Sequence, residues 1–150
     1  MAVLRDRPYA QFNFLVDLGT GATDGPEAAF QECGPIAASV DVIEYRNGND
    51  RDNSPRKLAG LTRYGDVTLR RGVIGSLGLY EWLDQLRRGD PAGLRDVVIS
   101  LQSEDRTAVA MAWRLVRARP VRYATGPLHA RGADVAIEEL TLAYERLEIE

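Results

Sequence analysis

The stretch RKLAGLTRYGDVTLRRG, residues 56–72, decides the fold of this chain. Its first ten residues include two glycines and show no sustained alternation, which indicates an extended loop. Residues 66–71 alternate with period two, so Val67, Leu69 and Arg71 share one face of a strand and the residues between them share the other. A long basic loop that leads into a strand has little use inside a compact monomer. The stretch therefore favours an arm that reaches a neighbouring molecule.

Alternating apolar and polar residues also predict strands on the N-terminal side of this stretch. These strands are predicted at residues 9–18, 30–33 and 36–46. The phase of the third slips between Val42 and Ile43, which indicates either a β-bulge or a strand buried on both faces. Residues 47–55, NGNDRDNSP, are polar and rich in turn formers, so we expect a hairpin tip or a mobile loop there.

One helix is predicted after the stretch, beginning at Ser76 and ending before Gly89. Its apolar residues recur at helical spacing and form one stripe: Leu79, Trp82, Leu83 and Leu86. Further strands are predicted at residues 96–102, 107–119 and 134–147, with a polar turn at 103–106. The phase of the last strand shifts near Glu138. Residues 120–132 are expected to be irregular, with at most a short strand at 121–124.

These elements predict a mainly β fold, an antiparallel β-barrel or sandwich with one amphipathic α-helix. A chain of 150 residues forms one domain, residues 1–150, within which residues 47–64 are expected to form the extended arm. Several predicted strands are longer than the usual ~5–6 residues. Long strands leave long unpaired edges, which either cause unwanted pairing or serve for pairing with another copy.

The composition excludes several classes of protein. The net charge of −3 gives no general attraction for nucleic acid, so no specific nucleic-acid binding is expected. No apolar run is long enough for a transmembrane helix, and the N-terminus lacks the apolar core of a signal peptide. The single cysteine cannot form an internal disulfide. We therefore expect synthesis and assembly in the cytoplasm.

Four features could carry chemistry, but each has a simpler structural explanation. His129 is the only histidine and has no nucleophile motif near it, and Glu32 disfavours a thiolate at Cys33. Glu138 and Glu139 are adjacent on a strand and point to opposite faces, which suits solvated positions or subunit contacts. The glycine-rich turn at 19–26 lacks the Gly-Lys-Ser/Thr ending of a phosphate loop. The sequence therefore predicts no enzyme, no catalytic residue, no metal site and no cofactor.

Basic and aromatic residues fit a structural role instead. The basic side chains of the opening stretch are expected to contact acidic residues of a neighbouring copy, and they are Arg56, Lys57, Arg63, Arg70 and Arg71. Tyr64 is the only aromatic residue among them, which is too few for stacking on nucleic-acid bases. Trp82 and Trp113 are expected to anchor the core from the helix and from the strand at 107–119.

A resemblance appears in the same region. Residues 9–147 resemble the phage tail tube protein family, which includes inner-tube subunits of contractile tails and of extracellular contractile injection systems. The motifs that carry it are Tyr45-Arg46-Asn47-Gly48, Arg56-Lys57-Leu58, Gly60-Leu61, residues 64–72 and Trp82. Ala59 departs from the pattern, because such proteins often have proline there.

The resemblance implies a tail-tube fold and a structural subunit that self-assembles into stacked hexameric rings with a hollow lumen for cargo. It implies a sheath protein and baseplate and tube-initiator proteins as partners, in a phage tail or injection particle that is released from the cell in some systems. The residues expected at subunit contacts are Tyr45, Arg46, Asn47, Gly48, Arg56, Lys57, Leu58, Gly60, Leu61, Arg63, Tyr64, Arg70 and Arg71. Two alternatives stay open at this point: a tube initiator of the same particle, and a monomeric β-barrel that binds a ligand.

Overall fold

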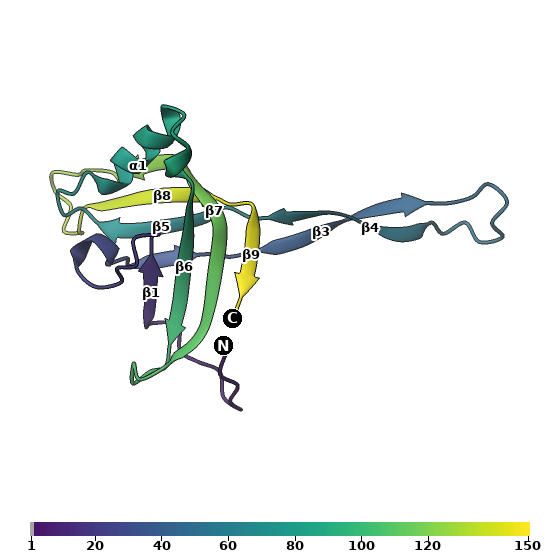
Figure 1. Cartoon of the computed structure of the whole chain (residues 1–150), viewed down its shortest axis with the longest axis horizontal. Coiled ribbons are helices and arrows are strands. Elements are labelled where there is room, and N and C mark those ends of the chain that lie inside the picture. Colours follow the sequence, from purple (N-terminus) through teal and green to yellow (C-terminus); the bar gives the residue numbers. More distant parts are fainter. Residues whose placement is uncertain (1) are drawn as a thin grey trace.

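A body of curved sheet and a long two-stranded arm make up the chain (Figure 1). This computed structural model describes residues 2–150. A seven-stranded sheet forms the body, and the arm is a separate two-stranded sheet. The strands are β1 Phe14–Asp17, β2 Glu32–Gly34, β3 Ala38–Tyr45, β4 Arg56–Tyr64, β5 Val67–Gly72, β6 Arg95–Gln102, β7 Val109–Thr125, β8 Ile137–Ala143 and β9 Arg146–Ile149, and the helix is α1 Gly78–Arg87. The predicted mainly β, antiparallel fold with a single helix is confirmed.

Strand β7 is the longest element and joins the two halves of the body. The strand order is β1-β6-β7-β8-β5-β2, with β9 also paired to β7, and every pairing is antiparallel. The first half of β7 pairs with β6 and β9, and its second half pairs with β8. Residues 120–125 therefore belong to β7, and the prediction that 120–132 are irregular is wrong for this part of the range. Pro120 lacks an N–H, but the register with β8 shifts beside it, so the strand continues through the proline.

The core lies between the concave face of this sheet and helix α1. Val67 and Leu69 of β5 and Leu140 of β8 are fully buried there. Trp82 is also buried, and its indole Nε1 donates a hydrogen bond to the Gly93 carbonyl at 2.6 Å. The predicted apolar stripe of the helix is thus confirmed at its centre.

Other element boundaries differ from the sequence prediction. The first strand is shorter, because only residues 14–17 pair with β6. The last segment forms two strands, β8 and β9, that break at Tyr144 and Glu145. Glu138 stays in phase with Leu140, so the predicted phase shift near Glu138 is wrong: the carboxylate occupies an interior position.

The largest correction concerns residues 56–64. We expected a loop, but this segment is strand β4, paired with β3 along its whole length. Most side chains on both faces of the pair are exposed, so the segment has no buried face and no period-two pattern that would indicate a strand.

Candidate assembly surface

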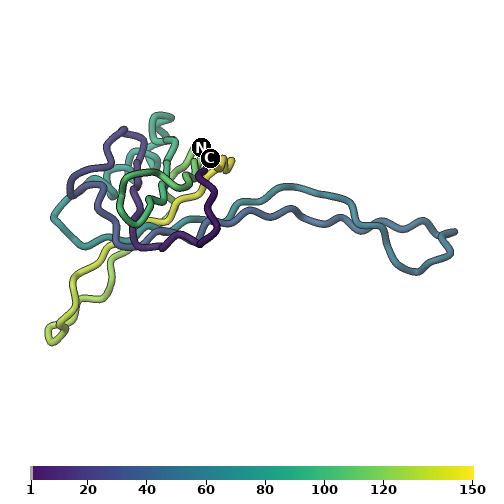
Figure 2. The backbone as a smooth tube through the Cα atoms, turned by 90° about the horizontal axis from the view of Figure 1, so that it is seen from below, coloured from purple at the N-terminus to yellow at the C-terminus, as the bar shows by residue number. Residues whose placement is uncertain are grey.

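Strands β3 and β4 form an antiparallel hairpin that projects from the body in both views (Figures 1 and 2). The register shifts between Val40 and Val42, where β4 has an extra residue. The sequence predicted either a bulge or a strand buried on both faces between Val42 and Ile43; the strand is exposed, and the bulge lies between Val40 and Val42. Gly60 lies at this bulge, and a Cβ there would come within 3.0 Å of the Asp41 carbonyl oxygen. The close approach of the two backbones requires glycine.

The tip of the arm, residues 46–55, is organised by its own hydrogen bonds. The Arg46 guanidinium donates to the carbonyl oxygens of Asp50 and Asp52, both at 2.9 Å. The Asn47 amide donates to the Asp50 carboxylate at 3.0 Å, and the Tyr45 hydroxyl donates to the Asn47 side chain at 2.6 Å. The hairpin-tip prediction is confirmed, and these contacts give the tip a defined shape.

Apolar side chains are exposed on both faces of the arm. Ile43 and Leu58 face each other across the register, and they are 52% and 49% exposed. Leu61 is 73% exposed. Val40, Val42 and Tyr45 are exposed as well. Exposed apolar side chains that gather in one region of a soluble protein often mark a surface that binds a partner.

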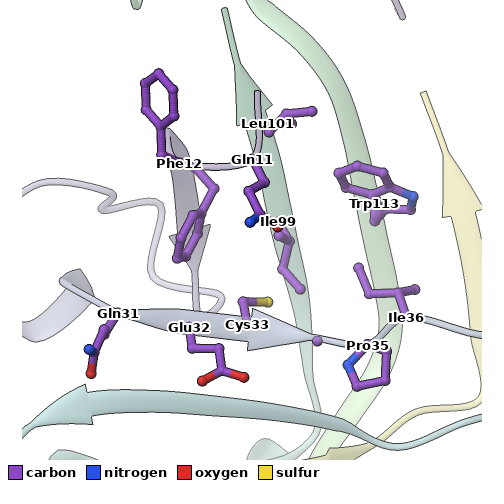
Figure 3. Close-up of a pocket in the computed structure, with 12 residues that line it drawn as sticks. Gln11, Phe12, Gln31, Glu32, Cys33, Pro35, Ile36, Ile99, Leu101 and Trp113 are labelled. Carbon is purple, nitrogen blue, oxygen red and sulfur yellow. The ribbon is translucent and has the colours of Figure 1, made fainter. Parts of the chain in front are cut away.

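The body also presents unpaired strand edges. Strands β1 and β2 end the seven-stranded sheet, and a cavity of about 700 Å³ lies between them. Figure 3 shows this cavity, with Phe12, Ile99 and Trp113 on one side and Cys33 and Pro35 on the other. Free strand edges can pair with another chain.

Arg71 has a different place from the one we expected. It is 1% exposed, and its Nε donates to the Glu138 carboxylate at 2.7 Å, while its Nη1 donates to the Glu27 carbonyl at 2.9 Å. The Tyr123 hydroxyl donates to the other oxygen of Glu138 at 2.6 Å. The expected contact of Arg71 with a neighbouring copy is therefore corrected to an interior ion pair within its own chain.

Arg70 points to the opposite face, as the alternation predicts, and contacts the carboxylates of Glu139 at 3.1 Å and Glu32 at 3.5 Å. Glu138 and Glu139 lie on opposite faces as predicted, but Glu138 is buried and not solvated. The sequence analysis missed its role. An acidic residue in phase with Leu140 and Leu142 was the available signal.

The remaining predicted contact residues lie on the arm or at its base. Arg63 forms an ion pair with Asp41 at 2.7 Å, and Arg56 lies 3.6 Å from Asp50. Tyr64 packs against Tyr144 at the base, with ring centroids 5.7 Å apart. Gly48 belongs to the tip, and Lys57 lies opposite Glu44 in the register. Trp82 is in the core as expected, whereas Trp113 is only partly buried and lines the cavity between β1 and β2. That the arm contacts another copy stays a prediction.

The candidate chemical groups, Cys33 and His129, have different surroundings. Burial raises the pKa of the Cys33 thiol to about 12, so the thiolate is disfavoured. His129 is exposed, and its Nδ1 accepts a hydrogen bond from the Arg131 amide at 3.1 Å. Among residues 2–150, no group of three or more His, Cys, Asp and Glu side chains is arranged to hold a metal ion. Within the same residues, no helix has the length and apolar character needed to cross a membrane.

Solved structures of contractile particles contain chains similar to this one. A chain in the cryo-EM structure of an extracellular contractile injection system, the PVC sheath–tube complex in the extended state, is 27% identical with a TM-score of 0.82, covering 97% of this chain and 93% of that chain. A chain in the anti-feeding prophage baseplate is 27% identical with a TM-score of 0.81, covering 97% of both chains. A chain in the anti-feeding prophage cap is 25% identical with a TM-score of 0.83, covering 100% of this chain and 95% of that chain.

More distant likeness extends only to the fold. Hcp1 from Flavobacterium johnsoniae is 15% identical with a TM-score of 0.54, over 91% of this chain and 93% of that chain. No curated protein sequence matches the chain. The sequence pattern of the family described as T4-like virus tail tube protein gp19 matches residues 10–148, which is nearly the whole chain. The chain therefore belongs to this tail tube family and is a structural tube subunit of a contractile, phage tail-like system.

Proposed function

We propose that six copies of this chain close into a ring and that the rings stack through the β3–β4 arm into a hollow inner tube. The observation that carries this proposal is the arm itself, which exposes Ile43, Leu58 and Leu61 far from the core of the body. Each such side chain contributes roughly 1.5–3 kcal/mol when it is fully buried. In a single copy only part of this free energy is gained, because the three side chains are 52%, 49% and 73% exposed, and a neighbouring ring that covers the arm would supply the rest.

The geometry of the contact supports stacking. The arm projects from one end of the body, so a contact between the arm of one copy and the body of the next is head to tail (Figure 2). Head-to-tail contacts propagate, while contacts around a ring close on themselves. The free edges of β1 and β2 and the exposed edge of β9 are candidates for the ring contacts.

The particles that contain similar chains suggest which partners this subunit has. The similar chains come from a sheath–tube complex, a baseplate and a cap, which supports a sheath, a baseplate and a terminating cap as partners of this tube. We propose that the lumen carries cargo, that the subunit has no enzymatic activity, and that the finished particle acts outside the producing cell.

Deleting residues 47–57 tests the stacking role. We expect a folded subunit that forms no long tubes in electron micrographs, because the tip and the start of β4 are lost. A sharper variant replaces Ile43, Leu58 and Leu61 together by serine, which keeps the length of the arm. The matched control is Leu128→Ser, at a leucine that is 83% exposed on a loop of the body. Long tubes of normal appearance from the triple variant would contradict the proposal.

A tube initiator is the second candidate, because the chain matches a baseplate chain and a sheath–tube chain equally well by identity. The number of copies per particle, measured by quantitative mass spectrometry, separates the two. A repeated subunit is present in many rings, whereas an initiator is limited to one. The monomeric ligand-binding barrel is set aside, because the family is a tube family.

A further inference from the structure

Apolar side chains are also exposed at the end of the body opposite the arm. Strand β5 runs away from the base of the arm, and the segment that links it to α1, residues 73–77, lies at that far end in both views (Figures 1 and 2). Val73, Ile74 and Leu77 are 48%, 50% and 67% exposed, whereas Trp82 further along is buried in the core. The three side chains are therefore available to a partner.

A groove of about 610 Å³ adjoins this segment. It is lined by Gln31, Gly72, Asp134, Val135 and Ile137. Val135 is 73% exposed, and the Val73 amide donates a hydrogen bond to the Ala136 carbonyl at 2.9 Å, which ties the groove to the segment. We use the term docking surface for the exposed apolar residues of both parts: Val73, Ile74, Leu77 and Val135.

The two ends of the molecule carry opposite charge. Residues 46–57, the outer part of the arm, contain four basic and two acidic side chains. Residues 18–31 and 73–81, which border the docking surface, contain three acidic side chains and no basic one: Asp24, Glu27 and Glu81. The loop between β7 and β8 adds no net charge, because Arg131 offsets Asp134. The arm of one copy and the far end of another are thus electrostatically complementary.

Part of this charge is compensated within the chain. Glu27 accepts from the Ser76 hydroxyl at 2.7 Å and lies 3.6 Å from Arg71. Asp24 and Glu81, however, are exposed, as is Lys57 on the arm. Salt screens exposed charges, so charge complementarity mainly steers and orients the approach of two copies, and burial of apolar surface supplies most of the affinity.

The arm and the docking surface of one copy cannot meet, because they lie at opposite ends of the molecule (Figures 1 and 2). A second copy displaced along the direction of the arm brings its docking surface to the arm of the first. The contact joins two unlike surfaces, so it leaves one arm and one docking surface free and can repeat from copy to copy.

We propose that the docking surface binds the outer half of the arm of a copy in the next ring. Ile43, Tyr45 and Leu58 lie on this half and are each about half exposed, and they would pack on the apolar residues of the docking surface. Arg56 and Lys57 would face the acidic side chains that border it. The proposal rests on the stacking role of the arm and adds the surface that receives the arm.

Replacing Ile74 and Leu77 together by serine tests the docking surface. Both side chains lie outside the core, so the midpoint of urea unfolding of the free subunit should not change. The yield of tubes in electron micrographs should fall roughly tenfold or more, because apolar burial at the contact is lost. The control is Leu4→Ser, at a leucine that is 98% exposed on the N-terminal segment, and it should form tubes as the wild type does.

Normal tube yield from the Ile74→Ser, Leu77→Ser variant would overturn the docking surface. It would leave the stacking role of the arm standing, because that role is judged by the arm variants alone. Tubes lost from the arm variants and from this variant alike support both proposals.

Cross-linking identifies the partner directly. In a variant with both Leu58→Cys and Leu77→Cys, a flexible bismaleimide should link the arm of each copy to the docking surface of the next. Denaturing gels should then show covalent products larger than one ring. Burial raises the pKa of the native Cys33 thiol to about 12, so this thiol reacts slowly, and the two single-cysteine variants measure its background.

Two results of the cross-linking would contradict the proposal. Intact tubes without products above the background would mean that the arm binds elsewhere on the next ring. Products that end at the size of one ring would place the contact between neighbours within a ring. The serine variant decides independently, since it needs no cysteine on the arm.

Discussion

The body and the arm use the same kinds of apolar residue with opposite results. Leu69 and Leu140 in the body are fully buried, whereas Leu58 and Leu61 in the arm are 49% and 73% exposed. The body curves its sheet around a core and covers it with α1, but the arm is a single layer that no other segment of residues 2–150 covers. A β-hairpin alone is at best marginally stable in water. The arm therefore depends on its root in the body and on whatever covers it in the assembly.

Charged residues show the same difference. The Arg71–Glu138 pair in the body is buried on both sides, while the Arg63–Asp41 pair on the arm has side chains that are 66% and 41% exposed. An exposed pair of this kind contributes at most about 1 kcal/mol, whereas breaking a buried pair by removing one partner costs about 3–5 kcal/mol. The interior of the body is thus specified by charge as well as by apolar packing.

The largest effect is expected from Glu138→Ala. Removing this carboxylate leaves the buried Arg71 without its counter-ion and the Tyr123 hydroxyl without its acceptor. We expect a loss of about 3–5 kcal/mol in the free energy of unfolding, measured by urea denaturation of the unassembled subunit. The matched control is the double variant Arg71→Met with Glu138→Leu, which removes both charges and should be much closer to wild type. A single variant as stable as the double would show that the pair does not specify the core.

The second prediction compares a leucine of the body with a leucine of the arm. Leu140→Ala should cost about 2–5 kcal/mol in the unfolding of the body, because it removes a fully buried side chain and leaves a cavity. Leu61→Ala should change the same quantity by less than about 0.5 kcal/mol, because the side chain is exposed in the free subunit. Tube yield should fall for both variants, for Leu61→Ala without loss of subunit stability. If both substitutions lowered the free energy of unfolding equally, the arm would not differ from the body in this respect.

The sequence predicts the body better than the arm for a physical reason. Where a strand has one buried face, as β5 does, alternation marks the strand and orients Val67 and Leu69 correctly. Strand β4 is exposed on both faces, so its residues are under no period-two constraint, and only its pairing with β3 shows that it is a strand. The burial of Arg71 was hidden for a related reason: its partner, Glu138, lies 67 positions away, and the pairing of β5 with β8 cannot be read locally.

The sequence also failed to predict features that depend on single residues or on distant segments. Pro120 signals the end of a strand, and the sequence does not reveal that β7 changes partners beside it. Within the candidate assembly surface, the arm and its tip were predictable from turn residues and from family motifs. The cavity between β1 and β2 and the groove of the docking surface were not, because they form between segments that are distant in sequence.

A smaller effect is expected at the bulge of the arm. Gly60→Val places side-chain atoms against the Asp41 backbone and the Ile43 side chain, where even a Cβ would have 3.0–3.2 Å contacts. Overpacking of this kind costs about 1–3 kcal/mol where the surroundings cannot relax. We expect a distorted arm and a lower tube yield, with the unfolding of the body unchanged. Gly48→Ala is the control, since a Cβ there meets nothing within 4 Å. Normal tubes from Gly60→Val would mean that the arm tolerates a change of shape at its bulge.

The smallest effect is expected where the N-terminal segment is tied to the body by charge. The Arg5 guanidinium donates two hydrogen bonds to Glu104, at 2.9 and 2.6 Å, and these bonds, together with one from the Ala10 amide, lower the pKa of Glu104 from 4.5 to about 2. Because the folded-state pKa is depressed, the stabilisation is fully present above pH 4.5 and is lost as the pH falls towards about 2. The group is exposed, so we expect a local release of the segment and not unfolding of the body. Carboxyl NMR should give a midpoint for Glu104 well below 4.5 in the wild type and a higher midpoint in Arg5→Gln. An unchanged midpoint in that variant would assign the shift to the Ala10 amide, which donates to the same carboxylate at 3.0 Å, and would leave the N-terminal segment held by its backbone alone.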